Sequence, residues 1–240
     1  MSQTTTAKAG SSQDFGANRN KLGMWFFLCA DAMMFAGLFG GYFMVRLANG
    51  EAWPIAQHYL NIPLTAVFTF DLIISSVTMV KAYESADTPD GEPIGVLPGL
   101  TVSNAPWVLR TFLGLTVLFG AAFIGFQYYE WSHFINYGLL PWDFHYEELT
   151  HIYHGLELGT LSGAQKAAFP LFFGCFYALT GFHGFHVTCG VIYNSVILIN
   201  DCRGKYESDD EAAESIETAG LYWHFVDLVW ILLFTFIYLV

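Results

Sequence analysis

T-G-F-H-G-F-H-V, residues 180–187, lies near the middle of an apolar run that extends from about Pro170 to Ile199. This run exceeds the ~20 helical residues that cross ~30 Å of hydrocarbon, so it predicts a membrane helix that is tilted or protrudes. His183 and His186 are three residues apart and therefore share one face of that helix. Polar side chains at this depth are costly and usually have a partner or a function.

Four other apolar runs are long enough to cross a membrane. The sequence therefore predicts an all-α integral membrane bundle of five transmembrane helices, at about 22–46, 62–81, 107–129, 169–199 and 222–240. Only 12% of the 240 residues are charged, against about a quarter in a typical soluble domain. Residues 1–20 are predicted to be a flexible polar tail, and residues 21–240 a single membrane domain. The net charge of −12 argues against nucleic-acid binding.

The distribution of lysine and arginine predicts the orientation of the bundle. With a cytoplasmic N-terminus, the outer side carries only Arg46 and Lys166. The cytoplasmic side then collects seven positive residues: Lys8, Arg19, Lys21, Lys81, Arg110, Arg203 and Lys205. This bias predicts a cytoplasmic N-terminus and an outer C-terminus.

Three connections between the predicted helices have distinct compositions. The long loop 130–168 should lie outside, and it contains four irregularly spaced histidines, which do not predict a metal site. Loop 82–106 is rich in proline, glycine and acidic residues, so it is predicted to be irregular and solvated. Residues 200–221 are predicted to contain a short exposed acidic helix.

Two carboxylates fall inside predicted membrane helices. Asp31 lies about nine residues into the first helix, and Asp71 lies near the middle of the second. A lone charged carboxylate at such depth costs ~3 kcal/mol or more. Each is therefore a candidate proton-handling group or a member of an interhelical hydrogen bond or ion pair. Glu130 is expected at the outer interface, as an anchor or a subunit contact.

Histidines in membrane helices raise the question of haem. His224 and Asp227 are one helical turn apart and are expected to pair with each other. His224 lies near the cytoplasmic side, roughly 15 Å in depth from His183 and His186 at 1.5 Å per residue. These histidines therefore cannot share one haem. We predict no catalytic residue, metal ligand or cofactor in this chain. A stand-alone transporter or channel remains an alternative, although no internal repeat or broken helix is evident.

Several stretches resemble subunit III of haem–copper cytochrome c oxidases, and they occur in the same order. They are G-M-W-F-F-L-C-A-D-A-M-M-F-A-G-L-F-G-G-Y-F at 23–43, residues 63–78 with S-S-V-T at 75–78, G-A-A-F-I-G-F-Q-Y-Y-E at 120–130, G-F-H-G-F-H-V at 181–187 and Y-W-H-F-V-D at 222–227. The last two match the family signatures closely. The five predicted helices correspond to the last five of the seven in mitochondrial members, a known bacterial pattern.

The resemblance implies a non-catalytic subunit of an aerobic respiratory oxidase in the bacterial inner membrane. Haem and copper are then expected in partner subunits I and II, with subunit III stabilising subunit I, binding phospholipid and supporting proton uptake. Asp31 falls at the position of the family's buried carbodiimide-reactive glutamate. Loop 130–168 is longer than usual, so cytochrome c or another respiratory complex is a candidate partner. A quinol oxidase or a nitric oxide reductase is the alternative complex.

The resemblance also changes the interpretation of the opening stretch. Gly181 and Gly184 are expected to permit close helix packing, as are Gly37 and Gly41 at GxxxG spacing in the first helix. His183 and His186 are expected to be buried hydrogen-bonding groups that fix neighbouring helices or lipid.

Overall fold

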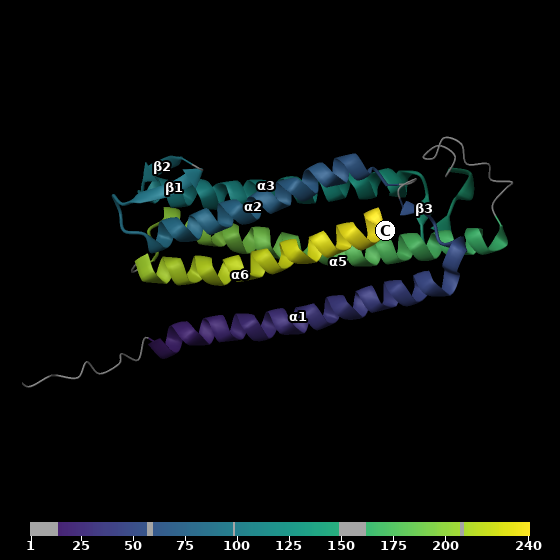
Figure 1. Ribbon diagram of the computed structural model, residues 1–240, viewed down its shortest axis with the longest axis horizontal. Coiled ribbons are helices and arrows are strands. Elements are labelled where there is room, and N and C mark those ends of the chain that lie inside the picture. The colour runs from purple at the N-terminus through teal and green to yellow at the C-terminus, as the bar shows by residue number, and fades with distance from the viewer. Residues whose placement is uncertain (1–13, 57–59, 98, 149–161, 207–208) are drawn as a thin grey trace, which may run out of the picture.

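The computed structural model describes residues 14–56, 60–97, 99–148, 162–206 and 209–240. Within these residues, five long helices lie side by side along the long axis of the molecule (Figure 1). They are α1 (Asp14–Asn49), α2 (Ile62–Asp87), α3 (Pro106–Asn136), α5 (Gly163–Cys202) and α6 (Asp209–Leu233). All five are long and apolar enough to cross a membrane. The predicted all-α membrane bundle is confirmed.

The helices extend beyond the apolar runs from which they were predicted. α3 continues to Asn136, so the predicted loop 130–168 begins instead at Tyr137. α5 starts earlier than predicted because Ser162 and Gln165 form a capping box that satisfies its first backbone N–H groups. The predicted separate acidic helix in 200–221 is wrong. Most of that segment is the first turns of α6, where carboxylates stabilise the positive end of the helix.

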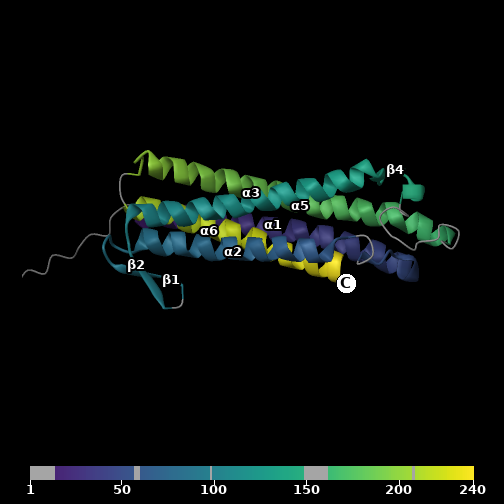
Figure 2. The same cartoon turned by 90° about the horizontal axis from the view of Figure 1, so that it is seen from above.

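Two short antiparallel hairpins lie at opposite ends of the bundle (Figure 2). β1 (Pro93–Leu97) pairs with β2 (Leu100–Ser103), and Gly99 has a φ of 83°, which the tight turn between them requires. The prediction that loop 82–106 is irregular is therefore wrong. β3 (Leu139–Leu140) pairs with β4 (Asp143–Phe144) after α3, followed by a 3-10 turn at Tyr146–Glu148.

Four helices form the core, and α1 runs along one side of it. α2 packs against α3 and α6, and α5 packs against α3 and α6. Among the long helices, α1 makes its main contacts with α5 and α6. In the most apolar part of α1, 17% of the residues are buried, against 50% in α6. α1 therefore presents most of its apolar surface outward.

Glycines set the closest approaches between helices of the core. A Cβ atom at Gly120 of α3 would lie 2.5 Å from the ring of Trp223, and one at Gly184 of α5 would lie 2.5 Å from Gln127. The expectation that Gly181 and Gly184 permit close packing is therefore confirmed. Gly37 and Gly41 of α1 differ, because nothing in the described chain lies within 4 Å of their Cβ positions. The described residues therefore supply no helix contact at these two glycines.

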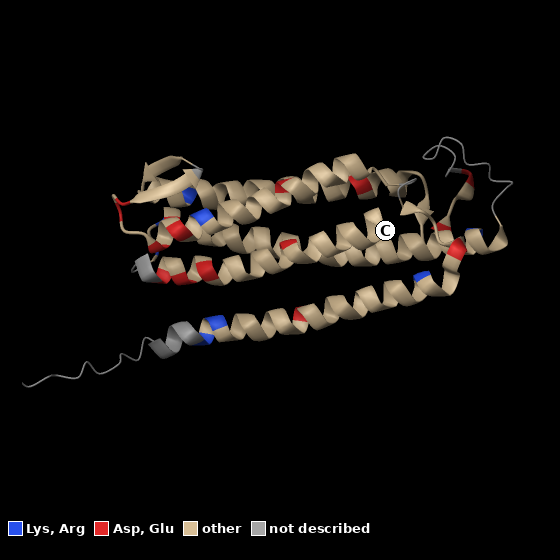
Figure 3. Ribbon diagram, in the orientation of Figure 1, with Lys and Arg blue, Asp and Glu red and all other residues tan. Residues whose placement is uncertain are grey.

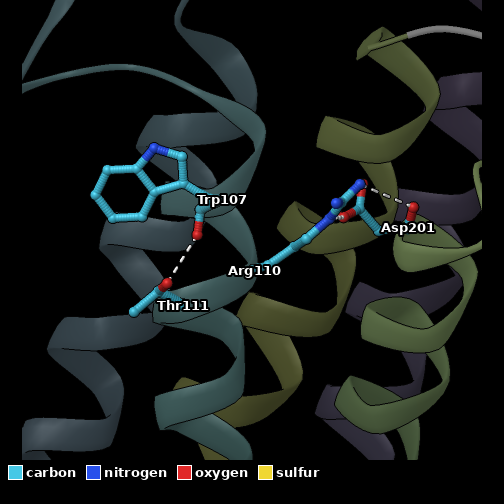
Figure 4. Close-up of polar contacts among 4 residues, drawn as sticks. All are labelled: Trp107, Arg110, Thr111 and Asp201. Atoms are coloured by element: carbon cyan, nitrogen blue, oxygen red, sulfur yellow. Dashed lines mark hydrogen bonds and ion pairs between the residues drawn. The ribbon is translucent and has the colours of Figure 1, made fainter.

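Charged residues gather toward the two ends of the bundle, with only a few in the middle (Figure 3). At the end that carries β1 and β2, Arg110 of α3 reaches the end of α5 (Figure 4). Its Nε donates to Asp201 Oδ2 at 2.7 Å, and a second guanidinium nitrogen donates to the Asp201 carbonyl at 3.3 Å. The next residue, Thr111, donates its hydroxyl to the carbonyl of Trp107, one turn earlier on the same helix. Arg110 thus adds a second donor to the Asp201 carbonyl, which also accepts from the Gly204 N–H, and so ties α3 to the end of α5.

Polar contacts between helices define two levels across the bundle. The first polar layer contains the Arg110–Asp201 and Lys21–Glu217 ion pairs. The second contains hydrogen bonds from Tyr42 to the Phe236 carbonyl, from Trp131 to Thr180, and from Tyr238 to Glu130. In each of four pairs, a residue of the first layer lies 21 positions from a residue of the second layer. The pairs are Lys21 and Tyr42, Arg110 and Trp131, Thr180 and Asp201, and Glu217 and Tyr238. Twenty-one helical residues rise ~31 Å, the thickness of a hydrocarbon layer.

The first turns of α5 extend beyond the second polar layer. Gly163 precedes Thr180 by 17 residues, or about 25 Å of helix. Aromatic rings of this segment pack against neighbouring segments, as Phe172 does on Trp53, Phe173 on Phe144 and Phe176 on Phe134. We call these six residues the aromatic cap. It builds a small hydrophobic core outside the span of the membrane.

Candidate functional site

The site at the centre of the bundle joins α1 to α5. Asp31 Oδ2 lies 3.2 Å from His186 Nε2, and both side chains are buried. The other ring nitrogen of His186, Nδ1, lies 2.8 Å from the Phe182 carbonyl oxygen. Because a carbonyl only accepts, Nδ1 carries the hydrogen of this bond. Nε2 faces Asp31 and forms an ion pair with it when the ring is protonated, and Asp31 Oδ2 has no hydrogen-bond partner among the described residues.

Sequence reasoning identified Asp31 and His186 separately but did not bring them together. The two helices are distant in sequence, and counting residues along an apolar run gives only an approximate depth for its polar side chains. A signal was nevertheless present, because both residues are polar and lie in the middle third of their apolar runs. A buried carboxylate and a buried imidazole at similar depth are natural partners.

An apolar groove of about 360 Å³ lies beside this pair. His186 lines it together with Met24, Phe27, Phe185, Cys189, Tyr193 and Tyr222. Tyr222 donates its hydroxyl to the His186 backbone carbonyl at 3.0 Å, which fixes α6 against α5 at this point. The site is thus a buried carboxylate–imidazole pair at the wall of a groove made of aromatic and aliphatic side chains.

His183 does not behave as expected. Its ring is fully buried, and within the described residues neither ring nitrogen has a hydrogen-bond partner. The ring instead lies between Phe123, at a centroid distance of 5.7 Å, and Trp230, at 5.0 Å. The expected hydrogen bond to a neighbouring helix is therefore wrong for His183, because aromatic carbon surrounds it. His183 serves packing between α3, α5 and α6.

The expected pair between His224 and Asp227 is present only as an electrostatic interaction, because no hydrogen bond joins the two side chains. Asp227 Oδ2 accepts a hydrogen bond from Ser76 of α2 at 2.8 Å, and its other oxygen has no partner in the described part of the chain. Two tryptophans of α6 make parallel contacts with α2. Trp223 Nε1 donates to Ser75 at 3.0 Å, and Trp230 Nε1 donates to Thr69 at 2.9 Å. Asp227 thus belongs to a row of α2–α6 hydrogen bonds.

Glu130, which was expected at the outer interface as an anchor or a subunit contact, is buried within the bundle. α3 continues well past it, and the π-helical segment Phe234–Leu239 that follows α6 brings Tyr238 against it. The Tyr238 hydroxyl donates to Glu130 Oε2 at 2.8 Å. Asp71 is half-buried on α2, and one of its oxygens has no partner among the residues that the structure describes. Neither carboxylate contacts the Asp31–His186 pair.

Within the described ranges, no group of three or more His, Cys, Asp or Glu side chains is arranged to hold a metal ion. Of the histidines in the predicted outer loop, His133 lies on α3, and His145 pairs with Asp143 at 3.3 Å. His151 and His154 lie outside the described residues.

Comparison with known proteins places these features in a family. The family model described as cytochrome c oxidase subunit III matches residues 162–240, which include α5 and α6. The chain is 31% identical over 226 residues to cytochrome c oxidase subunit 3 of Corynebacterium diphtheriae, covering 93% of this chain and 89% of the relative. It is 32% identical over 222 residues to cytochrome bo(3) ubiquinol oxidase subunit 3 of Pseudomonas putida, covering 91% and 84%. Cytochrome c oxidase subunit 3 of Bacillus subtilis is 29% identical, with 92% and 86% covered.

Proposed function

Because this membrane protein belongs to the subunit III family of haem–copper oxidases, we propose that it acts as the non-catalytic subunit III of a proton-pumping cytochrome c oxidase in a bacterial inner membrane. One observation carries the proposal: the two signature stretches, on α5 and α6, pack on each other and close the site around His186. Haem and copper belong in this proposal to partner subunits I and II.

The outward surface of α1 supports the proposed contact with subunit I. Gly37, Gly40 and Gly41 are exposed and adjacent to open space in the described chain. Small residues let helix backbones approach closely, which is the main source of helix association in lipid. We place subunit I on this surface, with the N-terminus of the chain in the cytoplasm.

The proposed function can be tested by purifying the complex in mild detergent. We expect oxidase subunits to copurify with the chain, and the optical spectrum of haem to follow those subunits. The isolated chain should show no haem or copper spectrum. Stoichiometric haem or copper on the isolated chain would contradict the proposal. Proton or substrate flux through vesicles that contain the chain alone would favour the transporter alternative.

The Asp31–His186 pair supports a role in proton uptake by the complex. The Asp31 carboxyl group lies 3.2 Å from the His186 ring inside the bundle, so the two groups can exchange a proton, and the adjacent apolar groove suits the acyl chain of a phospholipid. Asp31→Asn keeps the shape of the side chain but cannot become a carboxylate. We expect it to leave the initial rate of electron transfer unchanged and to shorten the turnover lifetime of the complex.

The matched control is Asp71→Asn, the same change in a membrane helix away from the groove. Turnover lifetime and proton uptake should be measured over many cycles for both variants. A lifetime of the Asp31→Asn complex equal to that of the unchanged protein would show that the pair is structural only.

Quinol is the second candidate electron donor, because the relative from Pseudomonas putida is a subunit of a ubiquinol oxidase. Oxygen consumption by the purified complex should be measured with reduced cytochrome c and with a quinol. We expect cytochrome c to be the better donor, and the connection between α3 and α5 to contribute to its docking. Faster turnover with quinol would reassign the complex without changing the role of this chain.

A further inference from the structure

The hairpin of β3 and β4 presents a tryptophan away from the rest of the protein, at the end of the bundle that lies beyond the second polar layer (Figure 1). Pro141 and Trp142 form the turn between the two strands, and Trp142 is 80% exposed. In the described part of the chain, no other large hydrophobic side chain is more exposed. Most of the others lie on the five long helices, which lipid surrounds. The exposure of Trp142 therefore requires a separate explanation.

The hairpin is fixed against the aromatic cap. Leu139 of β3 is fully buried, and Phe144 of β4 belongs to the cap itself. Gly138, which has a φ of 66°, leads into the hairpin, and its carbonyl accepts from the His145 N–H at 3.0 Å. The backbone that carries Trp142 is therefore held in place before any partner binds. A side chain presented in this way loses little conformational freedom on binding.

The tip of the hairpin lies outside the membrane. A Cβ atom at Gly174 of α5 would lie 3.6 Å from Pro141, so the turn is level with Gly174. Gly174 precedes Thr180 of the second polar layer by six residues, which places it about 9 Å further out. Lipid headgroups add only about 5–8 Å to each side of the hydrocarbon. Trp142 therefore follows a turn that lies beyond the interfacial aromatic belt, and lipid does not account for its exposure.

The surface around the tip is acidic. Between the end of α3 and the first turns of α5, the described residues include the carboxylates of Asp143, Glu147 and Glu148 but only one lysine or arginine, Lys166. Asp143 directly follows Trp142, and its side chain is 72% exposed. An exposed apolar ring with carboxylates around it complements an apolar pocket bordered by positive charge.

We propose that this hairpin tip docks a basic extramembrane protein. An apolar pocket of that protein receives the Trp142 ring, and its lysine or arginine side chains face the carboxylates around the tip. The inference rests on the proposed function, within which the docked protein is the one that delivers electrons to the complex. A tryptophan that is desolvated at the centre of an interface contributes strongly to affinity. Carboxylates at the rim act mainly on the rate of association and its dependence on salt.

The test measures oxygen consumption by the purified complex with reduced cytochrome c as the probe. We expect Trp142→Ala to raise KM about tenfold and to leave kcat unchanged, because docking is lost while the chemistry is not. Asp143→Asn combined with Glu147→Gln should raise KM about threefold at low salt and have no effect at high salt. Trp107→Ala is the matched control, at a tryptophan that is 58% exposed at the opposite end of the bundle, and it should leave KM unchanged.

The proposal is overturned if KM is the same for Trp142→Ala and the unchanged protein, or if Trp107→Ala raises KM equally. Cytochrome c with acetylated lysines, which lack the positive charge, should dock more weakly. Equal KM for the acetylated and unmodified forms would overturn the basic character of the partner. A complex that accepts electrons only from quinol would also contradict the proposal. Haem content and the oxidation of a small reductant report separately on the proposed function. If both are normal while Trp142→Ala has no effect, only the docking surface is refuted.

Discussion

α1 and α6 are equally apolar, yet α6 is largely buried and α1 is mostly exposed. α6 places Trp223, Asp227 and Trp230 against polar side chains of α2, and glycines of α3 and α5 make room for the Trp223 ring. α1 reaches the rest of the chain through a few polar points, chiefly Asp31 and Arg46. The difference shows that hydropathy identifies a membrane span, whereas small residues and polar partners decide how tightly it packs.

The largest effect is expected from filling the space that Trp223 occupies. Gly120→Leu would bring side-chain atoms into Trp223 and Val191, which lie 2.5 and 2.7 Å from the position of a Cβ. We expect a loss of about 3 kcal/mol or more, because neither neighbour can move without breaking the α3–α6 contact. The yield of folded subunit and its thermal midpoint in detergent provide the measurement. Gly125→Leu on the same helix, where nothing lies within 4 Å, is the control.

Changes on the exposed face of α1 should reduce assembly with subunit I without reducing the stability of this chain. Gly37→Leu and Gly41→Leu meet no atom of the described chain, so the thermal midpoint of the isolated subunit should not fall. We expect the amount of subunit I that copurifies to fall several-fold, because close backbone approach is lost. If copurification is unchanged, lipid covers this face rather than subunit I.

Removing one hydrogen bond between α6 and α2 should have a moderate effect. Trp230→Phe keeps most of the ring but leaves Thr69 without its donor. We expect a loss of about 0.6–2 kcal/mol, the range for such bonds in membranes. Trp25→Phe, at an exposed tryptophan of α1, is the matched control. Equal destabilisation by the two changes would show that ring volume, rather than the hydrogen bond, determines the loss.

The smallest effect is expected at the Arg110–Asp201 contact. The Arg110 side chain is 42% exposed, and the pair lies at the end of the bundle. Arg110→Ala should cost only about 0.2–1 kcal/mol, and less at high salt, because water screens an exposed pair. Unfolding in low and high salt provides the measurement. A loss as large as that of Gly120→Leu would show that this contact supports the whole α3–α5 packing.

The sequence was sufficient to predict the five spans, because each apolar run is long and most of the charged residues fall between the runs. It was insufficient for their ends, since Ser162 and the acidic residues before Leu221 extend helices into polar sequence. The environment of Glu130 depends on Tyr238, more than a hundred residues away, and no local pattern indicates that contact. The depths that follow from counting residues along each apolar run were likewise too approximate to predict the contact between Asp31 and His186.

The aromatic cap means that different parts of this chain bury side chains from different surroundings, which are lipid in one part and water in another. Within the membrane, lipid tails are as apolar as leucine, so burying a side chain there gains little beyond close packing. Beyond the second polar layer the surrounding medium is water, and the rings of Phe172, Phe173 and Phe176 are almost completely withdrawn from it. Burial of that kind carries a large heat-capacity change and is weakened by urea. The end of α5 is thus the part of the molecule whose stability follows temperature and denaturant as a soluble domain does.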